Sequence, residues 1–594
     1  MLLRLACSFL AAAPLFPADV LTPLAIRSVK VGGEIGRRID ATIRNNLLVI
    51  DVERDFLAPL SARDPKSGYI GLGKLLMSAV RFGAYTGDPQ VLALKERLVR
   101  RLVAAQEPDG YLGFFSPANR MTRLWDVHEA GYLIAGLTDD YLLFGEKGSL
   151  AAAVRSADYV LSHWNQIPGD WGERTGVAAH VAVTGLERTM LQLARATGDK
   201  RYAEFVEGPR ALGSWNLPIV IGRRAGIEGH IYAYMARSLA QLEMYRMKPA
   251  PALLAQADRA LDFLGGEGMA VTGGAGQWEI WTDDQDGRGQ LAETCATAYQ
   301  LRVYDSLLRL RGDARYGDLI ERTVFNTLFA AQSPDGRRIR YYSPTEGPRE
   351  YHPVDTYCCP TNYRRIVSEL PEMVYYRRGN GAAVVLFSDS EAQFELSGQK
   401  VRLKQETGFP NSGSVVIRVD PAQAAAFPLD IRIPAWAAGA ALSVNGEAAA
   451  VRPGRFATID RKWKAGDRVE LKLPMSPRLV LGRQRQAGRA AVLRGPIVYA
   501  LNPTQNPELA KLDAADLGRY TIDPGSLELV SDGAVRPGGT GIRAGAWRPG
   551  YGTAAKHDLT VTLTEFPDPG ATATYFKLRD LSAAVDDELH RRAR

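Results

Sequence analysis

The sequence predicts an α+β multidomain protein in which an (α/α)6 toroid is followed by β-sandwich domains. The chain has 594 residues, enough for two or three domains. From about residue 35 to about residue 375, apolar residues recur every three or four positions, which is the spacing of one face of a helix. After about residue 377 the pattern alternates with a period of two, which is typical of half-buried strands. The change of period separates a helical part from a β-rich part.

The helical part contains about twelve candidate helices separated by turn signals. The turns Thr86-Gly87-Asp88-Pro89 and Thr197-Gly198-Asp199 share a Thr-Gly-Asp motif, and Arg311-Gly312-Asp313 falls in a similar place. This repetition indicates helix hairpins, the plan of an α/α toroid in which paired helices surround a central pocket. The helices are expected to begin near residues 36, 70, 90, 127, 148, 184, 200, 230, 253, 292, 314 and 361.

The β-rich part contains segments of alternating residues bounded by turn signals. The predicted strands cover 384–388, 414–419, 429–433, 469–473 and 490–495, and LTVTLT (559–564) and ATYFKL (573–578) follow a stretch rich in glycine and proline. Asn445-Gly446 predicts a tight hairpin turn. The expected division is a signal peptide over 1–18, the helical domain over 19–376, a β-sandwich over 377–480 and a second β-sandwich over 481–594.

Charge and hydropathy argue against two classes of partner. The net charge of +7 arises from 73 basic and 66 acidic residues, which is slight for this length and gives little support to nucleic-acid binding. After the N-terminus, the sequence has no stretch that is long and apolar enough to cross a membrane. The N-terminus itself, MLLRLACSFLAAAPLFPADV, is typical of an export signal cleaved near Ala18, so a secreted or periplasmic protein is expected. A buried N-terminal segment is the alternative interpretation.

Cysteine usage points to a metal. Cys7 would leave with the signal, and the remaining cysteines are Cys295, Cys358 and Cys359. Exported proteins normally pair their cysteines, but three cannot all pair, and adjacent cysteines rarely bond each other. With Glu293 two residues before Cys295, they make a Cys3Glu set of the ligand types that zinc prefers. The alternative is that each cysteine is a small buried apolar residue.

Several motifs then resemble glycoside hydrolase family 127 and its close relatives. They are ETCA (293–296), CCPTN (358–362), WDVHE (125–129), QEPDGYLG (106–113), RIPAWA (432–437), RKWKAGDRVELKLPM (461–475) and LRGPIVYAL (493–501). The resemblance runs from about residue 35 to residue 502, and the most specific signal is ETC followed by CCP. It implies an (α/α)6 barrel followed by β-sandwiches, and a retaining, exo-acting β-L-arabinofuranosidase that acts on plant-derived glycans.

The resemblance also implies roles for individual residues. Zinc would be bound by Glu293, Cys295, Cys358 and Cys359, and Cys358 would be the nucleophile. A thiolate is the reactive form of cysteine, and a bound dication favours deprotonation. The acid/base residue should lie shortly before ETC, where Glu279 is flanked by Trp278 and Ile280-Trp281. Apolar surroundings raise the pKa of a carboxyl group toward that of a working acid.

Other assignments stay open at this stage. Asp283 and Asp284 compete with Glu279 for the acid/base role, and Glu279 could equally be a solvated loop carboxylate. His128 and His230 match positions that contact sugar hydroxyls in the family, although an isolated histidine is more often structural. Tyr357 is expected to line the pocket, with core packing as the alternative.

One further family histidine is missing, and Thr184 lies near its expected place, which points to a different sugar.

Two other functions are open. The chain could be a polysaccharide lyase, which the α/α toroid also supports, or a non-catalytic carbohydrate-binding protein with a structural zinc. The sequence also leaves the oligomeric state open, a homodimer included.

Overall fold

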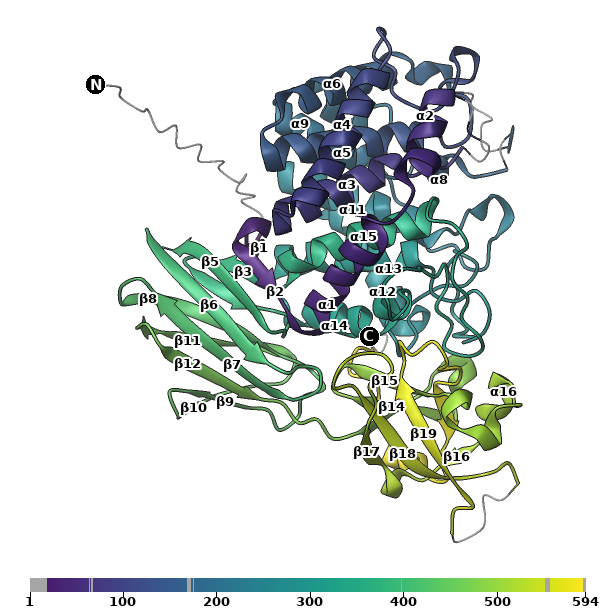
Figure 1. Cartoon of the computed structure of the whole chain (residues 1–594), viewed down its shortest axis with the longest axis vertical. Helices are drawn as coiled ribbons and strands as arrows, with labels where there is room; N and C mark the ends of the chain where they lie inside the picture. Colours follow the sequence, from purple (N-terminus) through teal and green to yellow (C-terminus); the bar gives the residue numbers. More distant parts are fainter. Residues whose placement is uncertain are drawn as a thin grey trace.

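The computed structural model describes residues 19–590 except 64, 66–67, 168–172, 175, 397 and 551–555. The predicted signal segment, 1–18, lies outside the described residues, as does Cys7. Figure 1 shows a helical domain in the upper part of the view, a β-sandwich at its lower left and a second β-rich domain at its lower right. In the described part of the chain, no helix is both long and apolar enough to span a membrane.

The helical domain is built around a closed ring. Among the described residues, six inner helices pack one against the next, and the last packs against the first. In ring order they are α3 (Leu72–Thr86), α5 (Asp126–Phe144), α9 (Leu186–Thr197), α11 (Ile231–Met247), α13 (Thr294–Arg311) and α15 (Cys358–Glu369). The outer helices that pack on them are α4 (Pro89–Ala105), α6 (Lys147–Ser162), α10 (Arg201–Glu207), α12 (Ala255–Phe263), α14 (Ala314–Thr323) and α1 (Gly33–Thr42). The predicted toroid is confirmed, and each predicted helix start lies within three residues of an observed one.

The repeated turns work through glycine and aspartate. Gly87 ends α3 in the left-handed conformation with φ of +65°, which glycine adopts without a steric penalty. Asp88 then begins α4, because its side chain accepts hydrogen bonds from the backbone N–H groups of Gln90 and Val91. Gly312 and Asp313 connect α13 to α14 in the same way. Each turn therefore reverses the chain in very few residues, and the inner helices all run in one direction.

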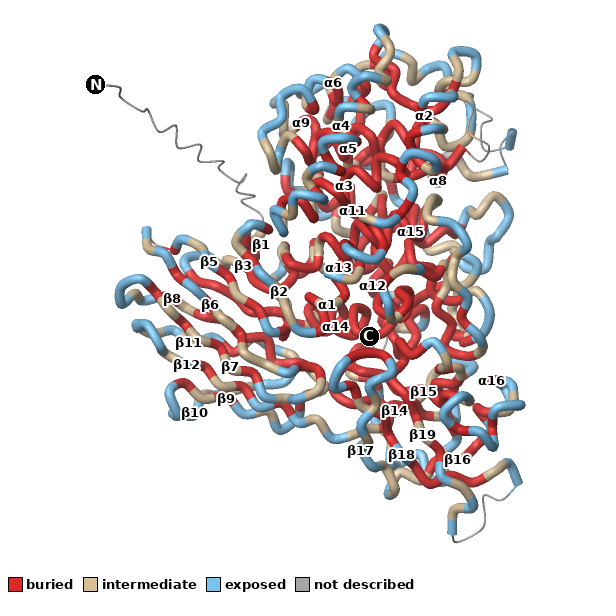
Figure 2. Tube along the Cα trace, viewed as in Figure 1, coloured by how far each residue is buried: buried red, intermediate tan, exposed pale blue. Residues whose placement is uncertain are grey.

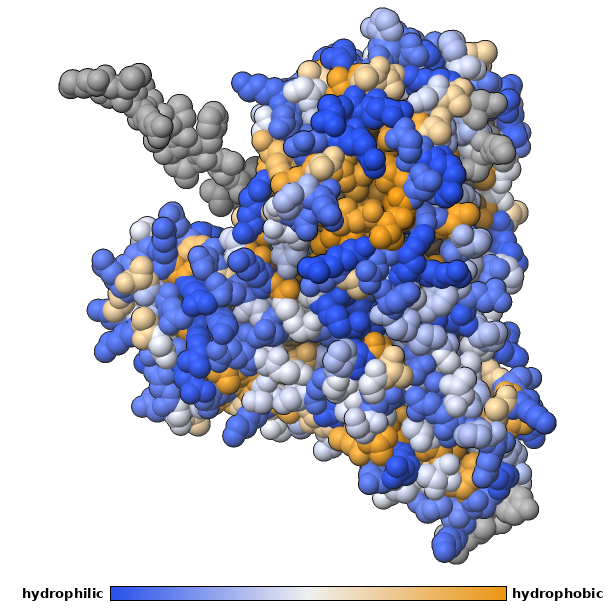
Figure 3. All heavy atoms as spheres, in the orientation of Figure 1, coloured by the Kyte–Doolittle hydropathy of each residue, from blue (hydrophilic) through white to orange (hydrophobic). Residues whose placement is uncertain are grey.

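The inner helices approach closely because small residues lie at their contacts. A Cβ atom on Gly73 of α3 would lie only 2.2 Å from the backbone carbonyl carbon of Tyr132 in α5, so no larger residue fits there. The interior of the ring is buried throughout, as the red segments of Figure 2 show. Hydrophilic side chains cover most of the face drawn in Figure 3. The ring is thus a packed core that leaves only its ends for a site.

The first β-domain is a sandwich of two sheets that takes strands from both ends of the helical domain. One sheet has the order β1 (Thr22–Pro23), β3 (Tyr375–Arg378), β4 (Gly381–Val384), β8 (Ala425–Ile433) and β11 (Arg455–Trp463). The other has the order β10 (Glu447–Ala449), β9 (Ala441–Val444), β12 (Asp467–Lys472), β7 (Ser414–Pro421), β6 (Gln399–Thr407), β5 (Ser390–Leu396) and β2 (Val29–Val31). The predicted Asn445-Gly446 turn joins β9 to β10, with φ of +52° and +88°.

Two sequence predictions about this domain need correction. Strands β1 and β2 belong to the sandwich, although residues 19–376 were assigned to the helical domain, because short edge strands have too few residues to show a period. The segment 384–388 is not a strand, since β4 ends at Val384. Val385, Leu386 and Phe387 are fully buried and connect the two sheets, and a continuous apolar run of this kind does not distinguish a strand from a buried connection.

The C-terminal domain contains a sheet that curls until its ends meet. Its strands follow the order β13 (Arg478–Leu481), β14 (Arg489–Arg494), β15 (Ile497–Leu501), β19 (Leu559–Glu565), β18 (Thr540–Trp547), β16 (Thr521–Ile522) and β20 (Tyr575–Lys577). β17 (Glu528–Ser531) pairs with β18, and β20 pairs with β14. The predicted strands at 490–495, 559–564 and 573–578 are confirmed. Their arrangement differs from the two facing sheets predicted for 481–594, because strand periodicity carries no information on which edges pair.

A buried ion cluster fixes the sandwich to the helical domain. Arg432 of β8 is fully buried and donates to the Val385 carbonyl at 2.6 Å. Its guanidinium also pairs with Asp318 and Glu321 of α14, both of which are buried. Charges removed from water in this way are tolerated only when they are paired. Arg432 therefore determines how the two domains fit together.

We expect Arg432→Met to lower the free energy of unfolding by about 3–5 kcal/mol, because Asp318 and Glu321 would remain buried without their cation. Arg418→Met is the matched control. Arg418 pairs with Glu406 at 3.0 Å on the partly exposed face of the sandwich, and this change should cost less than about 1 kcal/mol. Denaturant unfolding of both variants measures the difference. Equal losses in the two variants would contradict the role given to Arg432.

Candidate active site

The predicted site residues gather at the N-terminal ends of the inner helices. They lie at the starts of four helices: His128 in α5, His230 before α11, Glu293 and Cys295 at α13, and Cys358 and Cys359 at α15. Because the inner helices run in one direction, these starts meet at one end of the ring. The N-terminus of a helix carries a partial positive charge, which favours thiolates and carboxylates there.

Glu293, Cys295, Cys358 and Cys359 form a buried cluster whose ligand atoms all lie within 4.8 Å of one another. Cys359 Sγ is 3.3 Å from Cys295 Sγ and 3.9 Å from Cys358 Sγ. Glu293 Oε1 is 3.5 Å from Cys359 Sγ and 3.9 Å from Cys358 Sγ. The fold thus brings together the residues that the sequence pattern grouped as a ligand set. We refer to these residues as the thiol cluster.

The shape and donors of the thiol cluster fit a tetrahedral metal ion. With Zn–S bonds of ~2.3 Å, the ligand atoms of a tetrahedral site lie ~3.8 Å apart, close to the 3.3–3.9 Å separations of the cluster. Among the described residues, Glu293 Oε2 is buried without a hydrogen-bond partner, and Cys295, Cys358 and Cys359 form no disulfide. A divalent cation would satisfy these atoms together, so the residues present can hold one.

Cys358 is the member of the thiol cluster that solvent reaches. The residue is 7% exposed, whereas Cys295 and Cys359 are each 0% exposed. Burial by itself would raise the pKa of the Cys358 thiol, but the neighbouring Cys295, Cys359 and Tyr341 side chains hold that pKa well below its usual range. Cys358 therefore combines access with a thiolate state, the two properties that a sulfur nucleophile needs.

A tight turn carries Glu279 toward the thiol cluster. Gln277 and Ile280 exchange backbone hydrogen bonds of 3.1 and 3.0 Å, so Trp278 and Glu279 are the two central residues of the turn. Their φ angles are +53° and +71°, in the left-handed region that residues other than glycine rarely adopt. Turns of this kind normally contain Asn-Gly or Asp-Gly. The backbone is strained at this position, as is common where a functional side chain must be aimed.

The hydroxyl group of Tyr341 connects Glu279 with Cys358. It donates a hydrogen bond to Glu279 Oε1 and lies 3.1 Å from Cys358 Sγ. The Tyr342 hydroxyl donates to the same carboxyl oxygen at 3.4 Å. Because a single hydroxyl spans the gap, the separation is compatible with the ~5–5.5 Å between the two carboxyl groups of retaining glycosidases. The sequence analysis missed both tyrosines, since no motif distinguishes them from core residues.

The environment of Glu279 gives it the pKa of a working acid. Burial raises the pKa of Glu279 to about 7, and the negative charge of Cys358 adds to the shift. Hydrogen bonds from Tyr341 and Tyr342 oppose it. A carboxyl group with a pKa near neutrality can both give up and accept a proton at physiological pH.

The competing carboxylates point elsewhere. Asp284 Oδ2 lies 3.2 Å from the guanidinium of Arg485 in the C-terminal domain, and Asp284 Oδ1 accepts from the backbone N–H of Asp286 at 3.2 Å. Among the described contacts, neither Asp283 nor Asp284 reaches the thiol cluster. Of the three carboxylates proposed for the acid/base role, Glu279 is therefore the one that the structure connects to Cys358, through the Tyr341 hydroxyl.

His230 faces the second oxygen of Glu279. Its Nδ1 accepts a hydrogen bond from the backbone N–H of Ala233 at 3.1 Å, which caps α11 and assigns the ring proton to Nε2. Nε2 is 3.6 Å from Glu279 Oε2. Burial lowers the pKa of His230 to about 4, so the ring is neutral at physiological pH and can donate. The structure thus places His230 next to the acid/base candidate.

His128 and Tyr357 lie one layer away from the thiol cluster. His128 is buried, and its Nε2 is 3.1 Å from the Tyr69 hydroxyl. The Tyr69 ring packs against Tyr357 with a centroid distance of 5.0 Å, and Tyr357 directly precedes Cys358. Tyr357 is only partly buried, so it can line the approach to Cys358. His128 is connected to this approach indirectly, because it contacts Tyr69, which packs against Tyr357.

Thr184 does not substitute for the missing histidine. Its hydroxyl donates to the carbonyl of Val181 at 2.7 Å, within its own turn of backbone. A nearby histidine, His180, lies in α8 (Ala179–Ala182), four residues upstream. Burial is the main cause of the lowered pKa of His230, and the charge of Cys358 opposes it. The charge of His180 lowers the same pKa further, so the two rings are close. The sequence analysis did not identify His180, because the expected place of the missing family histidine lies near Thr184.

A second layer of side chains orients the thiol cluster. Asn362 Nδ2 donates a hydrogen bond to Cys295 Sγ at 3.1 Å. Arg365 holds Asn362 in turn, by donating to its Oδ1 at 2.8 Å, and also contacts the Tyr299 hydroxyl at 3.3 Å. All of these residues are buried. Outer partners of this kind fix the orientation of a metal ligand and are a usual part of metal sites.

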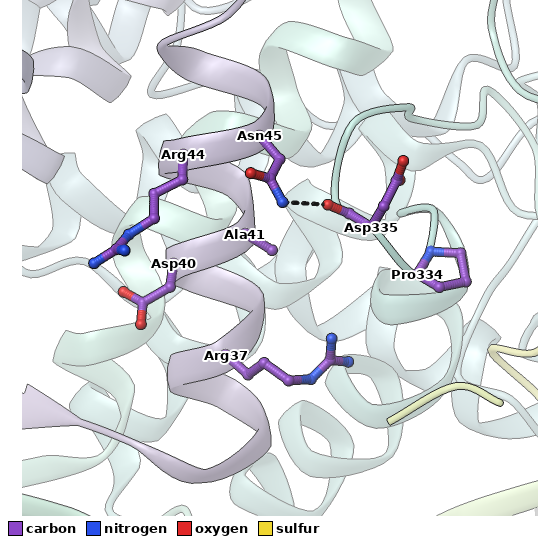
Figure 4. Close-up of a pocket in the computed structure, with 7 residues that line it drawn as sticks. All are labelled: Arg37, Asp40, Ala41, Arg44, Asn45, Pro334 and Asp335. Carbon is purple, nitrogen blue, oxygen red and sulfur yellow. Dashed lines mark hydrogen bonds between the residues drawn. The ribbon is translucent and has the colours of Figure 1, made fainter. Parts of the chain in front are cut away.

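A separate pocket of about 350 Å³ lies between α1 and the turn at Pro334–Asp335 (Figure 4). Asn45 of its wall donates to the backbone carbonyl of Asp335 at 2.6 Å. No member of the thiol cluster lines it, and its walls carry no pairing of nucleophile and acid. It is lined by Arg37, Asp40, Ala41, Arg44, Asn45, Pro334 and Asp335.

The chain resembles known proteins over nearly its whole length. Residues 68–372 match the family described as "Beta-L-arabinofuranosidase, GH127 catalytic domain", and residues 381–475 match the GH127 middle domain. A non-reducing end β-L-arabinofuranosidase of Bifidobacterium longum subsp. longum is 26% identical over 524 residues, which is 76% of this chain and 77% of the relative.

Solved structures share the fold. One is a GH127 β-arabinofuranosidase, with a TM-score of 0.79, 23% identity, and coverage of 96% of this chain and 99% of the other. Another is a GH127 β-L-arabinofuranosidase from Geobacillus stearothermophilus T6, with a TM-score of 0.75, 21% identity, and coverage of 93% and 100%. The catalytic-domain match alone spans more than half of the chain. The protein therefore belongs to glycoside hydrolase family 127 and is a glycoside hydrolase.

Proposed function

We propose that this enzyme is a retaining, exo-acting β-L-arabinofuranosidase of plant-derived glycans, with zinc in the thiol cluster, Cys358 as nucleophile and Glu279 as acid/base. The observation that carries the proposal is that Cys358, the least buried thiol of the cluster, shares one tyrosine hydroxyl with Glu279. The choice of sugar follows the activity named for the Bifidobacterium relative. Family membership gives no support to the lyase or the non-catalytic alternative.

In the first step, the protonated Glu279 carboxyl donates its proton to the glycosidic oxygen while the Cys358 thiolate attacks the anomeric carbon. The bond from that carbon to the leaving group breaks, and a thioglycosyl-enzyme forms. The raised pKa of Glu279 provides the proton at neutral pH. Zinc, when bound, would keep the cluster sulfurs deprotonated and stabilise negative charge on Cys358.

In the second step, the Glu279 carboxylate removes a proton from a water molecule, whose oxygen attacks the anomeric carbon from the face that the leaving group vacated. The carbon–sulfur bond breaks, the thiolate returns to Cys358, and two inversions give net retention. The Tyr341 hydroxyl, at 3.1 Å, can donate to the departing sulfur once Glu279 is protonated again. Neutral His230 faces the carboxyl from the other side, with its Nε2 3.6 Å from Glu279 Oε2.

We also propose export to the periplasm or the exterior. The carboxylate of Asp19 is buried and pairs with Arg246 at 2.8 Å and Arg309 at 2.7 Å. The support for export is the N-terminal sequence MLLRLACSFLAAAPLFPADV, which is typical of an export signal cleaved near Ala18. In an oxidising compartment the three thiols would depend on the metal for protection, because free buried thiols at such short distances oxidise readily once exposed.

Cys358→Ala should reduce kcat/KM for an aryl β-L-arabinofuranoside by more than about 10⁴-fold, because the two other thiols of the cluster are 0% exposed and out of reach of a substrate. The variant should remain folded, as circular dichroism and its unfolding transition will show. Ser343→Ala, at another buried residue of the same region, serves as the control and should stay near wild type. Near-normal turnover by Cys358→Ala would refute the nucleophile assignment.

The pH dependence should report Glu279. Its pKa in the folded protein is raised from 4.5 to about 7, so the proton needed in the first step is present below that pH and lost above it. For a substrate with a poor leaving group, kcat/KM should fall about tenfold per pH unit above pH 7. The Glu279→Gln variant should lose this basic limb, and azide should restore turnover of activated substrates by Glu279→Ala. An unchanged basic limb in Glu279→Gln would assign the acid elsewhere.

Asn362→Leu should weaken zinc binding about 10- to 100-fold, because the Cys295 sulfur would lose the hydrogen bond that orients it. Competition with a chromophoric chelator measures the affinity without reference to activity. Asn326→Leu is the matched control. Asn326 is equally buried but bonds the backbone of Arg322 and Pro496, outside the cluster. Equal affinities in the two variants would remove Asn362 from the metal site.

A further inference from the structure

An exposed tryptophan stands beside the acid/base residue. Trp278 is the first central residue of the turn that carries Glu279, and its side chain is 40% exposed. The other tryptophan of this segment, Trp281, is 1% exposed and packs between Tyr234 and Phe263. Single exposed apolar residues are common on protein surfaces, so exposure alone does not indicate a ligand. What suggests a ligand here is the position of Trp278 directly beside the acid/base candidate.

Exposure increases in order from the nucleophile outward. Cys358 is 7% exposed, the Glu279 side chain 20% and Trp278 40%. The anomeric carbon must lie over Cys358, and the glycosidic oxygen must lie at Glu279, because these are the atoms with which the two residues react. The sugar that is transferred therefore occupies the enclosed end of the site. The leaving group continues past Glu279 toward solvent, where Trp278 stands.

The indole of Trp278 is held in a defined orientation. The guanidinium of Arg224 lies 4.1 Å from the ring centroid and covers one face. Arg224 also lies close enough to Glu279 for its charge to affect that carboxyl, so ring, guanidinium and carboxyl are neighbours. The Trp278 backbone N–H donates to the Gln290 carbonyl at 2.9 Å. Since Arg224 covers one face and the residue is 40% exposed, the opposite face of the indole is the candidate surface for a ligand.

We propose that Trp278 is the platform for the leaving group and that this group is a sugar ring, stacked on the free face of the indole. The inference rests on the proposed function, because it assigns the second sugar of the same substrate. A sugar ring presents a flat face of C–H groups, which an aromatic face attracts, and an edge of hydroxyl groups, which remains in water. Aglycone binding of this kind favours a glycan terminus over an alkyl glycoside.

The test compares two substrates with the same transferred sugar. One is a β-L-arabinofuranosyl disaccharide, and the other is methyl β-L-arabinofuranoside, whose leaving group has no ring. In Trp278→Ala the ratio of kcat/KM for the disaccharide to kcat/KM for the methyl glycoside should fall about tenfold. Trp278→Tyr, which restores an aromatic face, should recover most of that ratio.

Leu217→Ala provides the control for loss of an exposed apolar side chain, because Leu217 is also 40% exposed and none of the described contacts joins it to Glu279 or the thiol cluster. The ratio should be unchanged in this variant. A Trp278→Ala ratio equal to that of wild type overturns the inference, even if both rates fall, because equal losses mean that Trp278 acts only through the position of Glu279. If wild-type enzyme hydrolyses neither substrate, the proposed function itself fails.

Discussion

The structure depends on the gathering of acidic ligands in a volume from which water is excluded. Burial raises the pKa of Glu293, Cys295 and Cys359 well above their usual values, whereas the pKa of Cys358 is held low. Four such groups cannot share a buried space as anions without a cation, and they do not satisfy one another as neutral groups, since Glu293 Oε2 lacks a partner in the described part of the chain. The toroid brings these four ligands together, because its inner helices all start at the same end of the ring. Glu293 and Cys295 lie at the start of α13, and Cys358 and Cys359 lie at the start of its neighbour α15.

The side chains that face the oxygens of the Glu279 carboxyl are neutral groups with a proton to donate. Tyr341, Tyr342 and neutral His230 surround the Glu279 carboxyl, and none of them carries a charge that would compete with the thiolate. The pKa of Glu279 can then be determined by burial and by the charge of Cys358, the residue with which it must cooperate. Formation and loss of the thiolate charge would shift the acidity of Glu279 in the direction that each chemical step requires.

The β-domains support this chemistry from a distance. Arg483 of the C-terminal domain donates to the Met269 carbonyl at 3.1 Å, and Gln486 donates to the Gln285 carbonyl at 3.0 Å. Both contacts lie on the segment between α12 and α13 that carries Glu279. A long loop with few helical hydrogen bonds would otherwise fluctuate, and a catalytic carboxyl group must be held within a fraction of an ångström. The C-terminal domain thus supports the segment from one side, while Ile231 at the start of α11 donates to the Glu279 carbonyl at 3.0 Å from the helical ring.

The sequence by itself determined the local features. Gly87 and Asp88 end and begin helices through their own backbone and side-chain preferences, and the Glu293 and Cys358 motifs define the ligands, because these signals depend on neighbours along the chain. Tertiary structure alone decided that β1 and β2 join the sandwich, that β20 closes on β14, and that Tyr341 stands between Cys358 and Glu279. Contacts between residues far apart in the chain depend on how finished helices and sheets pack, and no short-range pattern records that packing.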